Sequence, residues 1–200
     1  MLEKSVITVF EAKDLLTEDN DVKIAGAKFA AKPDDAELSA TEFQRQKSNG
    51  NIDKAYELGN RLSQILFTTD DILAVHCCKK YAADKNIRIN AQILYVFMAV
   101  TVLENSCPDS ITAKTAINYF HKCVKEKSPE LYNTILESGA FSLYLLCIRD
   151  AKMASNCIGN TFAESCDMEN DSAIIKIGDK LYNTYLNICR DELLHINFAL

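Results

Sequence analysis

Proline and glycine are scarce in this chain, which has three prolines and six glycines among 200 residues. Only two prolines follow residue 50, and both stand where a helix can begin. Pro108 precedes the capping residues Asp109 and Ser110, and Pro129 follows Ser128, a favourable N-cap residue. Proline is tolerated at a first helical position because its missing N–H would have no partner there. The scarcity of helix-breaking residues therefore predicts a series of helices.

The glycine-dependent signatures of common enzymes are also missing. No G-x-G-x-x-G, P-loop or G-x-S-x-G pattern occurs, and six glycines are too few to build a phosphate-binding loop elsewhere. The N-terminus has no basic region followed by an apolar stretch, so no secretory signal is visible. We therefore expect a cytoplasmic protein, and we assign it no catalytic residues and no cofactor.

Long hydrophobic runs and excess positive charge are absent too. The longest uncharged run, Ile89 to Leu103, contains Asn90 and Gln92 and is shorter than the roughly 20 residues that a membrane-spanning helix needs. We interpret it as a central core helix and expect no membrane contact. The formal net charge of −6 repels phosphate backbones, so no nucleic-acid partner is expected. The basic stretch 122–127 is interpreted as a solvated helix face.

Cysteine is the one residue type in clear excess, with eight copies and no C-x-x-C pair. Without a secretory signal, these side chains are expected to be reduced thiols that serve as small hydrophobic residues of the core. The cysteines are Cys77, Cys78, Cys107, Cys123, Cys147, Cys157, Cys166 and Cys189.

Apolar residues recur with a helical period after Asn51. The pattern predicts helices over 52–67, 72–83, 87–103, 111–125 and 129–136, one long pattern over 141–162, and a last helix from 174 almost to the end. Similar intervals between the helix starts are typical of antiparallel helices with short loops. The fold class is therefore all-α, an antiparallel bundle or compact array of about six to eight helices. A stack of helical hairpins is the second choice, because no repeat consensus recurs.

The first fifty residues differ from the rest and end at a turn over Ser48–Asn51. We predict an N-terminal arm or small helical subdomain over 1–50 and a helical core domain over 51–200. The arm is expected to pack on the core or on a second copy, while 51–200 folds without it. Any strand is expected at Ser5–Phe10, which is rich in β-forming residues.

A five-residue pattern recurs around Gly59, Gly159 and Gly178. It consists of an aliphatic residue, the glycine, Asn or Asp, any residue, and an apolar residue. Glycine inside a helix costs about 1 kcal/mol relative to alanine, so some gain should offset it. One interpretation is close packing of a second helix against the glycine, and the other is backbone exposed to a ligand. We favour close packing, because each glycine lies within an apolar stripe.

Glu192 and His195 form the sharpest chemical motif. Glu-x-x-His places a carboxylate and an imidazole on one helical face, as in ferritin-like di-iron bundles. Those sites need a second such motif and two further glutamates, and no second motif occurs here. An alternative stripe through Cys189, Leu193 and Ile196 would turn Glu192 and His195 towards solvent. We therefore predict that they hold no metal.

The other candidate groups are weaker. His76, Cys77 and Cys78 are adjacent and would diverge on a helix, and His121 and Cys123 would point apart. Aromatic side chains could line a pocket between helices, although we favour core packing because the residues recur at helical spacing. These side chains are Tyr95, Phe97, Tyr144, Tyr182 and Tyr185.

The sequence as a whole favours a non-catalytic helical protein that acts by protein–protein interaction or self-association. A small-molecule-binding bundle with a pocket between helices is one alternative. A metal-dependent enzyme that uses Glu192 and His195 is the other. The first hypothesis predicts an exposed apolar helix face, the second an enclosed cavity lined by tyrosines, and the third further acids or histidines close to Glu192.

Overall fold

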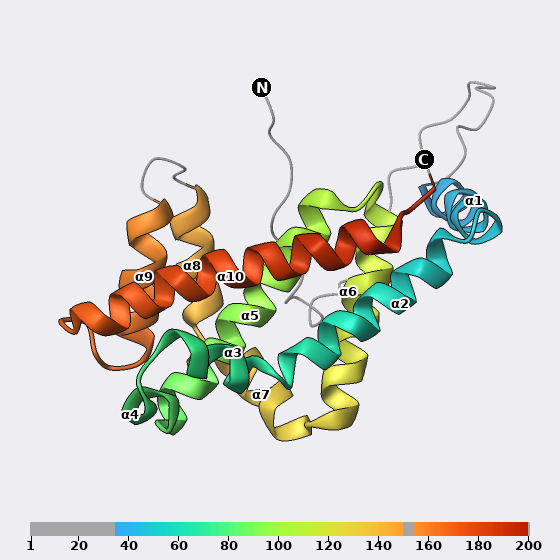
Figure 1. Cartoon of the computed structure of the whole chain (residues 1–200). Coiled ribbons are helices and arrows are strands. Elements are labelled where there is room, and N and C mark those ends of the chain that lie inside the picture. Colours follow the sequence, from blue (N-terminus) through green and yellow to red (C-terminus); the bar gives the residue numbers. More distant parts are fainter. Residues whose placement is uncertain (1–34, 150–153, 200) are drawn as a thin grey trace, which may run out of the picture. The chain divides into compact units, whose positions relative to one another are not determined.

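The computed structural model of the chain describes residues 35–149 and 154–199. They belong to one compact unit, residues 35–200, and these described residues form helices and no strand (Figure 1). The all-α prediction is therefore confirmed, whereas Ser5–Phe10 lies outside the described residues. The helices are α1 (Asp35–Ser48), α2 (Asn51–Leu66), α3 (Thr69–His76), α4 (Lys79–Ala82), α5 (Lys85–Ser106), α6 (Ser110–Lys127), α7 (Pro129–Glu137), α8 (Ala140–Arg149), α9 (Ala154–Ser165) and α10 (Ser172–Ile196).

Side-chain caps begin four of these helices. The carboxylates of Asp84, Asp109 and Asp171 each accept hydrogen bonds from two backbone N–H groups, at the starts of α5, α6 and α10. The Ser128 hydroxyl accepts one from Leu131 at the start of α7, where Pro129 occupies the first turn. Each cap contributes about 1 kcal/mol by satisfying donors that the helix cannot. The two helix starts predicted from Pro108 and Pro129 are thus confirmed.

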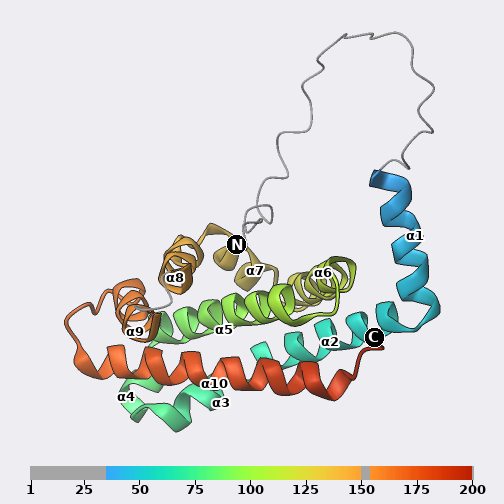
Figure 2. The same cartoon turned by 90° about the horizontal axis from the view of Figure 1, so that it is seen from above.

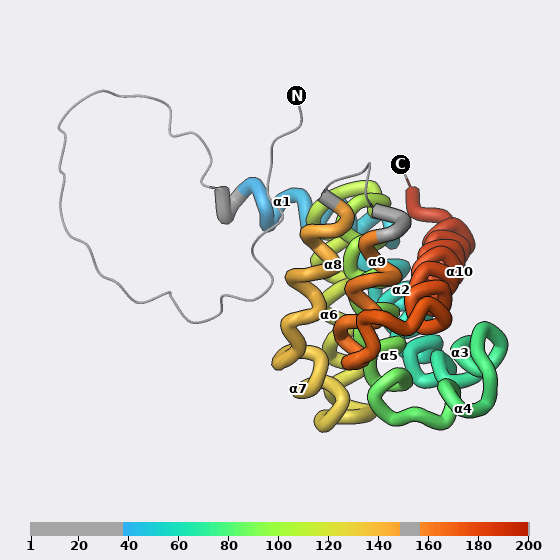
Figure 3. The backbone as a smooth tube through the Cα atoms, turned by 90° about the vertical axis from the view of Figure 1, so that its left-hand side faces the viewer, coloured from blue at the N-terminus to red at the C-terminus, as the bar shows by residue number. Residues whose placement is uncertain are grey.

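Helix α5 forms the centre of the unit. It is buried along most of its length, and it contacts α3, α6, α8, α9 and α10. Figure 2 shows α5 running between α10 on one side and α8 on the other, and Figure 3 shows it enclosed by its neighbours. By length and composition α5 could cross a membrane, but 72% of its apolar window is buried inside the structure, as in a core helix. The interpretation of Ile89–Leu103 as a central core helix is confirmed.

The glycines of the short recurrent pattern lie where helices approach most closely. A Cβ atom on Gly59 of α2 would lie 2.5 Å from the Ala116 carbonyl oxygen of α6. A Cβ on Gly159 of α9 would lie 2.5 Å from the Ile175 carbonyl oxygen of α10. Gly178 of α10 faces back onto α9. Close packing of a second helix, rather than exposure to a ligand, is therefore the correct interpretation of the pattern.

A buried asparagine ties the C-terminal residues to the start of α2. Asn51 is fully buried, and its side chain donates to the Ala199 carbonyl oxygen and accepts from the Ala199 N–H, each at 2.8 Å. It also donates to Gln46 of α1 at 2.7 Å. Because a buried amide needs these partners, the contact holds three segments together. Helix α1 thus lies in the same compact unit as the core, and folding of residues 51–200 alone stays a prediction.

The structure has more helices than the six to eight expected, because two predicted helices are broken. The single helix predicted over 72–83 is wrong. Cys77 and Cys78 are extended between α3 and α4, and Tyr81 of α4 donates its hydroxyl to the Asp171 carboxylate at 2.8 Å. The long pattern over 141–162 is likewise two helices, α8 and α9, which pack against each other. No proline or glycine marks the break at Cys77, so local sequence could not reveal it.

We expect Gly59→Ala to lower the free energy of unfolding by about 1–3 kcal/mol, although alanine favours an isolated helix by about 1 kcal/mol. The added Cβ would force α2 away from the α6 backbone. Urea unfolding followed by circular dichroism measures the change. Gly139→Ala is the control, because a Cβ there meets no atom within 4 Å, and it should shift stability by less than about 0.5 kcal/mol. Equal stability of both variants would contradict the close approach.

Candidate functional site

The structure places His195 on the exposed side of α10, whereas Glu192 is half-buried beside α2. Glu192 accepts a hydrogen bond from the Arg61 guanidinium of α2 at 3.1 Å. His195 is exposed, and its Nδ1 lies 2.7 Å from the Asp191 carbonyl oxygen. The inward stripe runs instead through buried Cys189 and Ile196, with half-buried Leu193 between them. The described residues contain no group of three or more His, Cys, Asp or Glu side chains that could hold a metal ion.

We expect Ile196→Ala to cost about 2–5 kcal/mol of stability, because it empties a buried position. The exposed neighbour His195→Ala should cost less than about 0.5 kcal/mol. Thermal unfolding measures the stability of both variants against that of the wild type. Elemental analysis of the wild type and of His195→Ala then checks for bound metal. Stoichiometric iron, manganese or zinc that disappears in His195→Ala would restore the enzyme hypothesis.

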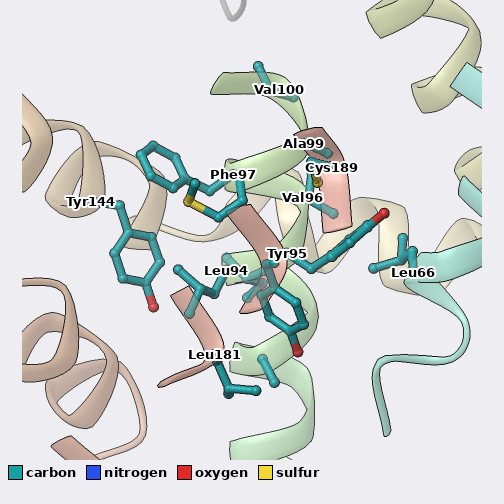
Figure 4. Packing of buried hydrophobic residues seen from close by; sticks show 14 of the residues in the cluster. Leu66, Leu94, Tyr95, Val96, Phe97, Ala99, Val100, Tyr144, Leu181 and Cys189 are labelled. Atoms are coloured by element: carbon teal, nitrogen blue, oxygen red, sulfur yellow. The ribbon is translucent and has the colours of Figure 1, made fainter. Parts of the chain in front are cut away.

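Four of the five aromatic residues proposed to line a pocket pack in pairs, and the fifth, Tyr182, is half-buried against the core. The Tyr95 and Tyr185 rings meet edge to face at 5.2 Å, and the Phe97 and Tyr144 rings lie 5.3 Å apart (Figure 4). The Tyr95 hydroxyl donates to the Leu62 carbonyl oxygen at 3.0 Å. Figure 4 shows Phe97 and Tyr144 within the same cluster as Leu94. Burial raises the pKa of Tyr95, Tyr144 and Tyr185, so their phenols stay neutral and serve as core.

The expectation that all cysteines are free is wrong for one pair. Cys147 of α8 and Cys157 of α9 form a disulfide, with their Cα atoms 5.4 Å apart. The other six cysteines are free. Burial raises the pKa of Cys107, Cys166 and Cys189 to about 12, so these three thiols are protonated at neutral pH. Sequence reasoning missed the pair because it depends on how α8 and α9 pack, which spacing alone does not show.

Alkylation should separate the cysteines into three classes. Exposed Cys78 should react with iodoacetamide in the folded protein, whereas buried Cys189 and Cys166 should react only after unfolding, since the thiolate is the nucleophile. Cys147 and Cys157 should require a reductant as well. Peptide mass spectrometry measures each site. Modification of Cys147 in unfolded, unreduced protein would contradict the disulfide.

The outer face of α8 is apolar. Leu143 and Leu146 are 39% and 62% exposed, whereas the next residues in the chain, Tyr144 and Cys147, are buried. No charged residue occurs between Ser138 and Ile148. We call Leu143 and Leu146, together with exposed Leu136 at the end of α7, the leucine face. Figure 3 shows α7 and α8, the two helices that carry these leucines, along one side of the unit.

Two grooves lie along the exposed side of α6, and we call them together the α6 groove. One, of about 650 Å³, is lined by Asn118, His121, Lys122, Lys125, Glu126, Pro129 and Tyr132. The other, of about 360 Å³, is lined by Tyr56, Thr115, Asn118, Tyr119 and Lys122. Their shared residues, Asn118 and Lys122, make them neighbours. None of the aromatic residues that were proposed to line a pocket borders either groove.

Each lysine of the α6 groove lies over a tyrosine ring. The Lys122 ammonium lies 5.7 Å from the centre of the Tyr119 ring, and the Lys125 ammonium lies 5.8 Å from that of Tyr132. The His121 and Tyr132 rings meet edge to face at 5.9 Å. Burial lowers the pKa of His121, which favours its neutral form. The groove therefore combines two cations, flat aromatic surfaces and a neutral imidazole.

Sequence reasoning missed both surfaces. The lysines at 122 and 125 were interpreted as an ordinary solvated face, although their spacing from Tyr119 and Tyr132 is visible in the sequence. The exposure of Leu143 could not be predicted from the sequence, because α8 has apolar residues on both sides and either side could face the core. Comparison with known proteins adds no functional assignment: the chain matches no protein-family model, no curated protein and no solved structure.

Proposed function

We propose that this protein is a non-catalytic helical protein that acts by binding a second protein or a second copy of itself through the leucine face. The observation that carries the proposal is the pair of exposed leucines on α8, Leu143 and Leu146, in a stretch with no charged residue between Ser138 and Ile148. Single exposed leucines are common on protein surfaces, whereas neighbouring exposed leucines on one helix are typical of an interaction surface. Neither nucleic acid nor membrane is part of the proposal.

The leucine face has the energetic capacity for such a role. Removing a leucine side chain fully from water contributes about 1.5–3 kcal/mol, and Leu143 and Leu146 are already partly covered. A partner that covers both, together with Leu136, therefore gains a useful part of the free energy that a micromolar complex needs, which is about 8 kcal/mol. The remainder must come from contacts around these leucines.

The alternatives have less support. A small-molecule-binding bundle would need space between the tyrosines, and Tyr95, Tyr144 and Tyr185 are instead packed and buried. A metal-dependent enzyme would need acids or histidines around Glu192, but the group that contacts the Glu192 carboxylate is the Arg61 guanidinium. No specific observation favours either alternative over partner binding.

Self-association through the leucine face predicts a concentration-dependent mass. We expect Leu143→Glu with Leu146→Glu to shift the protein towards monomer in sedimentation velocity, because two buried carboxylates would oppose association. Leu194→Glu is the control, since Leu194 is 72% exposed on α10 and lies outside this face. Dissociation by Leu194→Glu to the same extent would contradict a role for the leucine face.

A monomeric wild-type protein would leave a different protein as the occupant. In that case a photo-crosslinking amino acid at Leu146 should capture one discrete partner in cells, and the same group at Leu194 should not. Capture of the same proteins from both positions, or from neither, would contradict the proposed function.

A further inference from the structure

The exposed side of α6 carries a second surface, the α6 groove, whose lining residues differ from those of the leucine face. Thr115, Asn118, Lys122 and Lys125 are spaced three or four residues apart, so they lie along one side of the helix. Both parts of the α6 groove follow this row, with Tyr56 of α2 beside one part and Tyr132 of α7 beside the other. From this arrangement we propose that the α6 groove docks an extended, acidic segment of a partner protein.

Positive charge is in excess in the groove. Each lysine ammonium has three N–H donors and no acceptor, whereas the tyrosine and threonine hydroxyls and the Asn118 amide can both donate and accept. Glu126 is the only carboxylate that lines either part. A segment rich in carboxylate oxygens would pair with the two ammonium groups, and charged hydrogen bonds are stronger than neutral ones.

The lysines are available to such a segment. The Lys122 ammonium lies 3.9 Å from Glu126, but both side chains are more than 60% exposed, so water screens this pair and it contributes little. The second contact of Lys122 is the face of Tyr119, and Lys125 lies over Tyr132. Contacts with aromatic faces remain compatible with an incoming carboxylate, because the ammonium group keeps free donors on its outer side.

The dimensions of the row fit a short peptide. Thr115 and Lys125 are separated by ten residues of one helix, which corresponds to about 15 Å at 1.5 Å per residue. An extended peptide advances about 3.3 Å per residue, so about five residues cover the row. A single small anion could contact Lys122 or Lys125 but would leave the tyrosines at the other end of the groove, Tyr56 and Tyr119, uncovered.

The net charge of the molecule distinguishes a short acidic peptide from a long polyanion. The chain carries −6 overall, and the two lysines of the groove make a local exception. A peptide of about five residues contacts only the part of the surface that carries these two lysines. A longer nucleic-acid strand would continue past that part along a molecule whose net charge is negative and opposes the approach of phosphates.

Fluorescence anisotropy with a labelled hexaglutamate peptide and the full chain tests the proposal. We expect saturable binding that weakens as salt is added, because the lysines are exposed. Lys122→Glu with Lys125→Glu should weaken binding at least tenfold, since a hydrogen bond to a charged group is worth about one factor of ten or more. Lys176→Glu with Lys180→Glu is the matched control: the same charge change at two exposed lysines of α10, with an expected effect below about threefold.

Three results would overturn the proposal. One is no saturable binding of hexaglutamate to the wild-type protein. Another is equal weakening by both lysine pairs, which would mean general attraction to positive charge. The last is tighter binding of an oligothymidine with a similar number of charges, lost in Lys122→Glu with Lys125→Glu, which would make the groove a nucleic-acid site. Circular dichroism of each variant confirms that it is folded, so a loss of binding can be assigned to the groove.

Discussion

The close approach of helix backbones at glycine is the constraint on which the rest of this fold depends. At Gly59, α2 comes so near to α6 that a single methyl group would touch the Ala116 carbonyl oxygen. At Gly159, α9 comes equally near to α10, and the Gly159 N–H donates to the Asp179 carboxylate at 3.0 Å. Helix α10 contacts α9 and α2 and packs along α5, so it connects the two crossings (Figure 1).

The tight crossing at Gly59 also determines what α6 can present to solvent. Its inner side is occupied by Ala116 and Phe120, which are fully buried against the core. With that side fixed, the helix cannot rotate, and Lys122 and Lys125 must lie outward. The α6 groove is therefore supported by a rigid helix, which lowers the entropic cost of binding a partner.

Most of the fold could be predicted from the sequence, because its signals are local. Capping at Asp109 and Ser128 fixes helix starts, and the uncharged run Ile89–Leu103 indicates the central helix. The surfaces and the disulfide could not be predicted, since they depend on which helices become neighbours. The break at Cys77 lies beside the contact of Tyr81 with Asp171, which is distant in sequence, and the pairing of Cys147 depends on how α8 packs against α9. Composition and periodicity do not report such contacts.

Helix α8 shows why packing decides function here. It is apolar on both sides, so sequence alone permits either side to face the core. The contact of Tyr144 with Phe97 and the disulfide from Cys147 to α9 fix one side inward. Leu143 and Leu146 therefore cannot be buried by a rotation of the helix. A second molecule, or a second copy of this one, would remove them further from water, and this is the physical reason to look for a partner at this face.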